Sequence, residues 1–248
     1  MEGKKYLFVV FLGLLSCLSF GQNKELIYDA FISGDMEAWK VVIDKMDEET
    51  VKTNNFKLEL IGYHIGYIGY NVGLEEYDIA KKHIELAQVY LNELKKDKFK
   101  PSYTYSSQGA LDGLRMGINK YTCVYLGPKI VSNAEQSVKK DCLNAEGYIL
   151  IGNSKYYMWA MLGGSKKGAL EYYKTAERAL ELSNKTYGNW CYLSLLTMIA
   201  HAYFEMANYE NANNYYRKIL DFEPNYSWVR DDVYPDFLVK SGIKDSCN

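Results

Sequence analysis

Residues 193–226, LSLLTMIAHAYFEMANYENANNYYRKILDFEPNY, carry the clearest structural pattern in the sequence. Apolar and aromatic side chains recur in it at helical spacing, which predicts two amphipathic helices. The positions are Leu195, Leu196, Ile199, Ala202 and Tyr203 in the first run, and Tyr209, Ala212, Tyr215, Tyr216, Ile219 and Leu220 in the second. Asn208 lies between the two runs, and Pro224 ends the second because proline lacks an amide donor. The stretch is therefore expected to form a helical hairpin.

The spacing within this stretch resembles that of the tetratricopeptide repeat. Counted from residue 193, Ala200 is the eighth residue, Tyr203 the eleventh, Ala212 the twentieth, Tyr216 the twenty-fourth and Pro224 the thirty-second. Such a repeat cannot bury its apolar face alone, so the resemblance implies stacked neighbours. It implies an all-α protein: a right-handed α-solenoid of about five antiparallel helix hairpins, closed by a C-terminal capping helix.

The same repeat template divides the rest of the chain into hairpins. The expected hairpins span roughly residues 23–47, 53–97, 104–143, 145–183 and 188–223, with a cap over 226–241. In the fourth hairpin Gly152 precedes Ala169 by five residues more than the template allows, and Gly163 to Ser165 are expected to form the longer turn. In the third, a break is expected at Gly127–Pro128. Residues 22–248 are thus expected to form a single domain.

The N-terminus has the pattern of a secretory signal peptide. Lys4 and Lys5 precede an apolar run, and Ser19 and Gly21 supply the small residues that signal peptidase needs. We expect residues 1–21 to be removed and the mature chain to be periplasmic or secreted. The stretch before Cys17 also resembles a lipobox, so the alternative is a lipoprotein anchored at Cys17. No other run is long enough to predict a transmembrane segment.

Composition narrows the classes of function. The formal charge is -2 and basic residues form no long block, which argues against nucleic acid as a partner. Tyrosine is abundant, with 24 copies, and most of these rings are expected to pack between helices. The mature chain would keep Cys123, Cys142, Cys191 and Cys247, none of them in a Cys-x-x-Cys pair. Their pairing is left open, and free buried thiols are favoured.

Catalytic patterns are missing from the sequence. His64, His83 and His201 are scattered over separate predicted helices, and none belongs to a metal-binding pair. Gly163 to Gly168 does not have the spacing of a phosphate-binding loop, and no Gly-x-Ser-x-Gly elbow is present. We therefore predict neither an enzyme nor a metal or cofactor site.

The family resemblance implies where a partner would bind. In tetratricopeptide proteins the first helix of each hairpin lines a concave groove, at fixed places of the repeat. The matching residues that we select as candidates are Asn153, Tyr156 and Tyr157 in the fourth hairpin, and Ser194, Thr197, His201 and Glu205 in the fifth. Their amide, imidazole and phenol groups are suited to hold an extended peptide. The leading hypothesis is an exported, non-enzymatic scaffold that binds a protein or peptide.

Two other hypotheses remain open. The first is a small-molecule-binding protein of the same fold, in which Tyr156, Tyr157 and Trp159 and the turn at Gly163 form an aromatic pocket. The second is an assembly subunit that packs against copies of itself.

Overall fold

The computed structural model describes residues 21–158, 160 and 163–243, and these are helical with no β-strand among them. Cys17, Trp159 and Cys247 lie outside these residues, as does the expected signal peptide except for Gly21. A first helix covers residues 21–33 and is called the N-terminal helix below. The remaining helices are α2 (Met36–Glu48), α3 (Asn54–Gly73), α4 (Tyr77–Lys96), α5 (Pro101–Ile118), α6 (Cys123–Lys140), α7 (Ala145–Tyr157), α8 (Lys166–Leu182), α9 (Trp190–Glu205), α10 (Tyr209–Phe222) and α11 (Tyr234–Ser241). The expectation of an all-α fold is confirmed.

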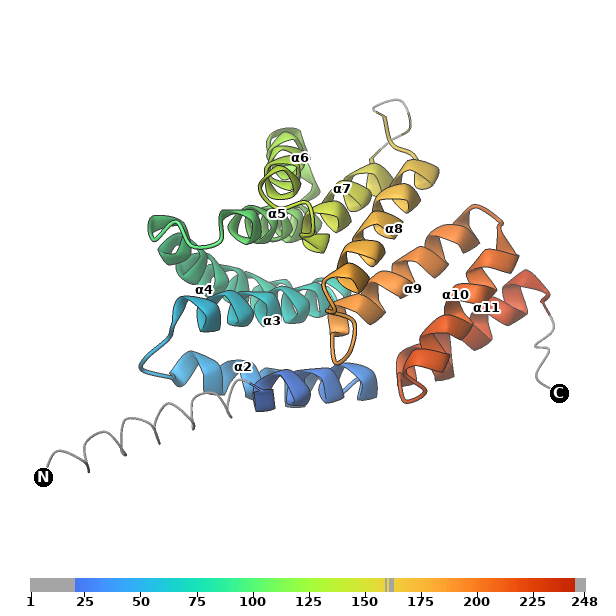
Figure 1. The fold of residues 1–248 in the computed structure, drawn as a ribbon, viewed down its shortest axis with the longest axis horizontal. Helices are drawn as coiled ribbons and strands as arrows, with labels where there is room; N and C mark the ends of the chain where they lie inside the picture. Colours follow the sequence, from blue (N-terminus) through green and yellow to red (C-terminus); the bar gives the residue numbers. More distant parts are fainter. Residues whose placement is uncertain (1–20, 159, 161–162, 244–248) are drawn as a thin grey trace, which may run out of the picture.

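The helices pack in adjacent pairs. The closest neighbours are α3 with α4, α5 with α6, α7 with α8, and α9 with α10, and the second helix of each pair also contacts the first helix of the next. Figure 1 shows these pairs following one another through the molecule. This arrangement is compatible with a helical repeat, because each element buries its apolar face mainly against neighbours in sequence.

Short polar side chains start several of these helices. Asn208, Asn189 and Asn144 accept hydrogen bonds from backbone N–H groups in the first turns of α10, α9 and α7. Ser165 does the same for α8, two residues after Gly163, whose positive φ of 94° belongs to the turn. Such caps satisfy amide groups that have no partner inside the helix, so the polar residues between the apolar runs fix where each helix begins.

The third pair differs from the sequence prediction. Gly127 and Pro128 were expected to separate two helices, but both lie inside α6. The turn occurs earlier, at Asn119, whose side chain accepts a hydrogen bond of 3.1 Å from the Tyr121 amide. Pro128 is the sixth residue of α6, so its missing N–H removes one hydrogen bond near the helix start, while the asparagine supplies a cap.

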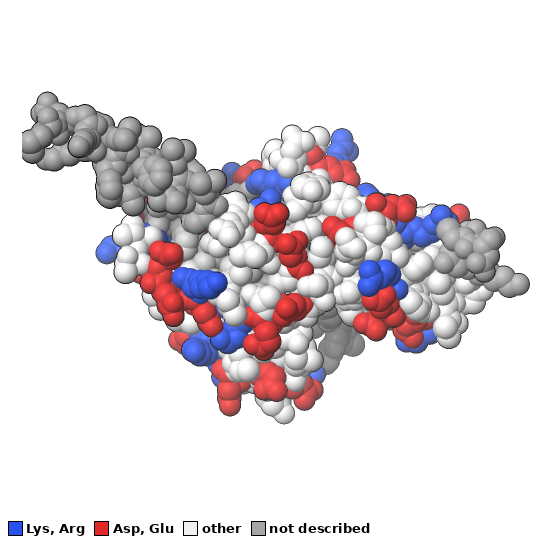
Figure 2. All heavy atoms as spheres, turned by 90° about the horizontal axis from the view of Figure 1, so that it is seen from below, with Lys and Arg blue, Asp and Glu red and all other residues white. Residues whose placement is uncertain are grey.

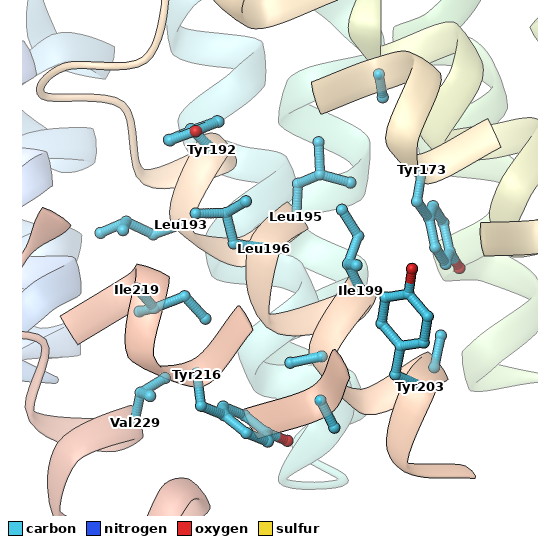
Figure 3. Packing of buried hydrophobic residues seen from close by; sticks show 14 of the residues in the cluster. Tyr173, Tyr192, Leu193, Leu195, Leu196, Ile199, Tyr203, Tyr216, Ile219 and Val229 are labelled. Atoms are coloured by element: carbon cyan, nitrogen blue, oxygen red, sulfur yellow. The ribbon is translucent and has the colours of Figure 1, made fainter. Parts of the chain in front are cut away.

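The largest apolar cluster lies in the C-terminal half of the chain. Its centre is α9, which contributes Leu193, Leu195, Leu196, Ile199 and Ala200, all fully buried. Figure 3 shows Leu193, Leu195, Leu196 and Ile199 of α9 among side chains from α8, such as Tyr173, and from α10, such as Ile219. A helix that is apolar around most of its circumference must be enclosed, so α9 is the helix around which this half is built.

The segment after α10 covers the end of that cluster. A π-helical turn, η3 (Trp228–Val233), leads into α11, and Val229, Tyr234 and Phe237 are buried against the C-terminal cluster. Pro235 lies in the first turn of α11, where proline is tolerated because backbone N–H groups in the first turn have no partner within that helix. The segment therefore covers α10, as a cap would.

The surface carries mixed charge. On the face in Figure 2, acidic and basic side chains are interspersed among uncharged ones, without a continuous basic patch on that face. Among the described helices none is both long and apolar enough to cross a membrane.

Candidate functional site

Four of the predicted groove residues meet at one rim of the molecule, where α7 and α9 end. The rings of Tyr156 and Tyr157 are 4.9 Å apart, and the Tyr156 ring is 6.4 Å from that of His201. Tyr157 is 74% exposed, and His201 and Glu205 are exposed as well. The fold thus brings together aromatic, imidazole and carboxylate groups that are up to 49 residues apart in sequence. We call Tyr156, Tyr157, His201 and Glu205 the α7–α9 rim.

A lysine links this rim to α8. The Lys166 ammonium forms an ion pair with Glu205 and lies 5.9 Å from the centre of the Tyr156 ring. The hydrogen bond from Lys166 lowers the pKa of the Glu205 carboxyl, and burial raises the pKa of the Tyr156 hydroxyl to about 12. The rim therefore presents a carboxylate, an ammonium and a neutral phenol near neutral pH.

The other three predicted groove residues are placed differently. Thr197 is buried, donates its hydroxyl hydrogen to the Leu193 carbonyl and hydrogen bonds with Tyr226, so it does not belong to an open groove. Asn153 accepts a 2.7 Å hydrogen bond from the buried Tyr173 hydroxyl, which gives its amide oxygen a structural role. Ser194 is half-buried on α9. A partner at the rim would therefore reach only part of the predicted set.

Beside the α7–α9 rim lies Phe204, an aromatic residue that also matches a groove place of the repeat but was not selected as a candidate. Phe204 is half-buried, with its ring 6.4 Å from His201 and 5.8 Å from both Tyr209 and Phe237. It continues the row of rings from Tyr157 toward α11. Its spacing after His201 on α9 was the available sequence signal, because residues three apart share a helix face.

The first and last parts of the chain meet at a group of four aromatic residues. The Phe31 ring lies 5.0 Å from Tyr226 and 5.8 Å from Trp190, and Trp190 packs edge-on against Trp39 at 5.2 Å. We call Phe31, Trp39, Trp190 and Tyr226 the aromatic join. A methyl group on Gly66 of α3 would come within 2.7 Å of the Trp39 ring, so this glycine lets the indole approach the helix.

Two hydrogen bonds reinforce the aromatic join. The Tyr28 hydroxyl donates to the Glu223 carboxylate at 3.0 Å, and the Ser227 hydroxyl donates to the Ile32 carbonyl at 3.0 Å. Each pair is 195 residues apart in sequence. An open solenoid has contacts only between neighbouring repeats, whereas this chain also joins its first hairpin to its last.

Two histidines that looked scattered in sequence form a buried pair. His64 on α3 and His83 on α4 place their Nδ1 atoms 3.0 Å apart, and both side chains are buried. The Nε2 atom of His64 lies 3.4 Å from Asp47 Oδ1, which also accepts a 2.8 Å hydrogen bond from the Tyr90 hydroxyl. His64 is ten residues before the turn at residues 74–76 and His83 is seven residues after it, so their distances from the turn did not single them out as partners.

The described cysteines are free, but two of them contradict the expectation of buried thiols. Cys123 and Cys142 are exposed and Cys191 is partly buried. Both exposed cysteines lie at the boundary of a helix, at the start of α6 and after its end, where a side chain has few neighbours. Burial raises the pKa of the Cys191 thiol to about 12, so that thiol stays protonated and unreactive near neutral pH.

Two shallow, open hollows lie away from Tyr156 and Tyr157, one along α10 at Arg217 and Asp221 and the other between α5 and α6 at Gln108 and Lys129. Among the described residues, no group of three or more histidine, cysteine or acidic side chains is placed to hold a metal ion.

No protein-family model matches the sequence, and a search of characterised proteins finds no match. The resemblance to tetratricopeptide repeats therefore depends on the residues of this chain and on the pairwise packing of its helices.

Proposed function

We propose that this protein is an exported, non-enzymatic scaffold of the tetratricopeptide type, which binds a protein or peptide at the α7–α9 rim. One observation carries the proposal: the first helices of two successive pairs bring Tyr157 and His201, both exposed, onto one edge together with Tyr156 and Glu205. Aromatic side chains contribute much of the free energy at protein interfaces, and the neighbouring imidazole and carboxylate offer hydrogen bonds to a peptide backbone.

The pairwise packing of the helices supports the repeat architecture in this proposal. In it, the pairs from residue 21 to Phe222 are five hairpins of a right-handed superhelix, with η3 and α11 as its cap. The signal pattern of residues 1–21 would direct the chain to the periplasm or the exterior, or anchor it at Cys17.

Site-specific photo-crosslinking in the source cells tests the binding surface. A photoreactive phenylalanine analogue replaces Tyr157 in one variant and His201 in another. A third variant carries it at Glu171, an exposed residue of α8, the second helix of the same hairpin as α7. We expect the two rim positions to capture the same protein, and the Glu171 position not to capture it.

Affinity measurements with the captured partner then test the contribution of each side chain. Tyr157→Ala and His201→Ala are each expected to weaken binding roughly tenfold, since a contact of about 1.4 kcal/mol corresponds to that factor. Equal capture from Glu171, or unchanged affinity in the double variant, would show that the partner binds elsewhere.

A further inference from the structure

The buried pair of His64 and His83 has a hydrogen-bonding requirement that depends on pH. Nδ1 of a neutral histidine is either a donor or an acceptor, and Nδ1 of an imidazolium is always a donor. At 3.0 Å the two Nδ1 atoms need one proton between them. A proton on each would set two donors against each other inside the fold. The pair therefore accepts one added proton but not two.

His64 is the member of the pair that faces a carboxylate. Its Nε2 faces Asp47 at 3.4 Å, so an imidazolium at His64 would donate to Asp47 on one side and to His83 on the other. Burial raises the pKa of Asp47, but the hydrogen bonds from His64 and Tyr90 outweigh it and hold that pKa below its usual value. The carboxylate thus stays charged in mildly acidic solution.

His83 is the member that resists the second proton. Its ring is buried, packs edge-on against Tyr67 at 4.9 Å and meets His64 at Nδ1. Burial, together with the neighbouring His64, lowers the pKa of His83 to about 4. The charged groups that act on it are Asp44 and Asp47 of α2, His64 of α3 and Lys82 of α4. The two carboxylates favour its protonation, and His64 and Lys82 oppose it.

The position of the pair connects it to the aromatic join. Tyr63, the residue before His64, accepts a 3.1 Å hydrogen bond from the Trp39 indole through its carbonyl. Trp39 in turn packs on Trp190 of α9. Tyr90 of α4 holds Asp47 of α2, so a displacement of α4 also removes a contact of α2. The histidines thus lie where α2, α3 and α4 are fixed to one another.

We propose that His64 and His83 form a pH-sensitive latch, in which protonation of both imidazoles releases α4 from α3 and loosens the aromatic join between the first and last hairpins. This inference concerns the N-terminal helices and stands apart from binding at the α7–α9 rim. The sign follows from linkage: His83 binds a proton less readily in the folded chain than in the unfolded chain. Its contribution to stability is present above pH 6.5 and is lost as the pH falls toward 4.

Hydrogen exchange of the full mature chain, corrected for the intrinsic pH dependence of exchange, tests the latch. Between pH 7 and pH 4 we expect the opening equilibrium of α2 and α4 to rise roughly 100-fold, with a much smaller change in α8. The near-ultraviolet circular dichroism of the Trp39–Trp190 contact should fall over the same range. Trp190→Phe identifies that contribution to the spectrum.

Two substitutions separate the latch from general acid sensitivity. In His83→Asn the side-chain amide can donate to His64 without titrating, and the rise in opening should be lost. His201→Asn changes an exposed histidine of α9 and should leave the pH dependence of opening in α2 and α4 unchanged. An equal loss of protection in the unsubstituted chain and in His83→Asn would overturn the proposal, as would unchanged protection of α2 and α4 down to pH 4.

An NMR titration keeps the proposal testable if His83→Asn does not fold. The described residues hold three histidines, so His201→Asn leaves only the imidazole signals of the pair. We expect one of the two to titrate well below pH 6.5 and to move together with amide signals of α4. Two signals that both titrate as in an unfolded peptide would rule the latch out.

Discussion

The two halves of this protein are held together by different chemistry. The C-terminal half has one large apolar cluster around α9, in which Leu193, Leu195 and Leu196 are fully buried. The N-terminal half has two smaller clusters, and between them polar groups take core positions, among them His64 and His83. Apolar packing follows from a repeating pattern along the chain, whereas a buried polar pair depends on which helices meet. Only the C-terminal half therefore has a clear signature in the sequence.

The N-terminal helix joins these two halves. Ile27 and Ala30 belong to one of the two N-terminal clusters, the one that contains Trp39. Tyr28 and Ile32 pack against the C-terminal cluster, and Phe31 packs against both of these clusters. Loss of this helix would therefore expose surface in both halves. We expect a substitution in this helix to destabilise both halves rather than a single repeat.

The largest expected effect is a core truncation in the C-terminal half. Leu196→Ala removes a fully buried side chain from α9 and should lower the free energy of unfolding by about 3 kcal/mol, since it leaves a cavity in the apolar cluster. Urea denaturation followed by circular dichroism measures it. Leu182→Ala is the matched control, because that leucine is 63% exposed, and a similar loss in both variants would contradict this view of the cluster.

A second substitution breaks the connection between the halves. Phe31→Ala removes the ring that contacts Trp39, Trp190 and Tyr226, and we expect a loss of about 2 kcal/mol, less than for a fully buried phenylalanine. Hydrogen exchange should then show faster opening of α10 as well as α2. Faster exchange in α2 alone would mean that the aromatic join does not couple the two halves.

Two glycines of α3 provide a matched pair with opposite expected signs. Gly66→Ala should destabilise the protein by about 1–2 kcal/mol, because the new methyl group meets the rings of Trp39 and Trp190. Gly62→Ala should stabilise it by about 0.5–1 kcal/mol, because open space surrounds that position and alanine favours helix. Thermal unfolding of both variants gives the two signs, and a stabilising Gly66→Ala would disprove the close approach of Trp39.

The smallest expected effect is at the α7–α9 rim. Glu205→Gln removes the ion pair with Lys166, and both side chains are more than a third exposed, so the cost in stability should be under about 0.5 kcal/mol. Its destabilising effect should shrink further in 1 M salt, where the charges are screened. Denaturation at low and high salt measures both, and a loss of several kcal/mol would assign the rim a role in folding rather than in binding.

Sequence periodicity predicted the helices of this fold better than it predicted the surroundings of individual side chains. Asn208 starts α10 and Pro235 lies in the first turn of α11, as their backbone chemistry predicts. Pro128 did not end a helix, because the cap at Asn119 determined the turn. Thr197 was placed in the groove by its position in the repeat, although the hydroxyl is satisfied by Leu193 and Tyr226. A repeat position tells which helix face a residue occupies, but not what covers that face.

Local periodicity and capping were enough to predict that the described residues are all-α and that residues 193–226 form a helical hairpin. The contacts of Phe31 with Tyr226 and of His64 with His83 became visible only in the folded structure. Such contacts join residues distant in sequence, and their geometry depends on the packing angles of whole helices. The aromatic join and the buried histidine pair are therefore properties of the assembled fold.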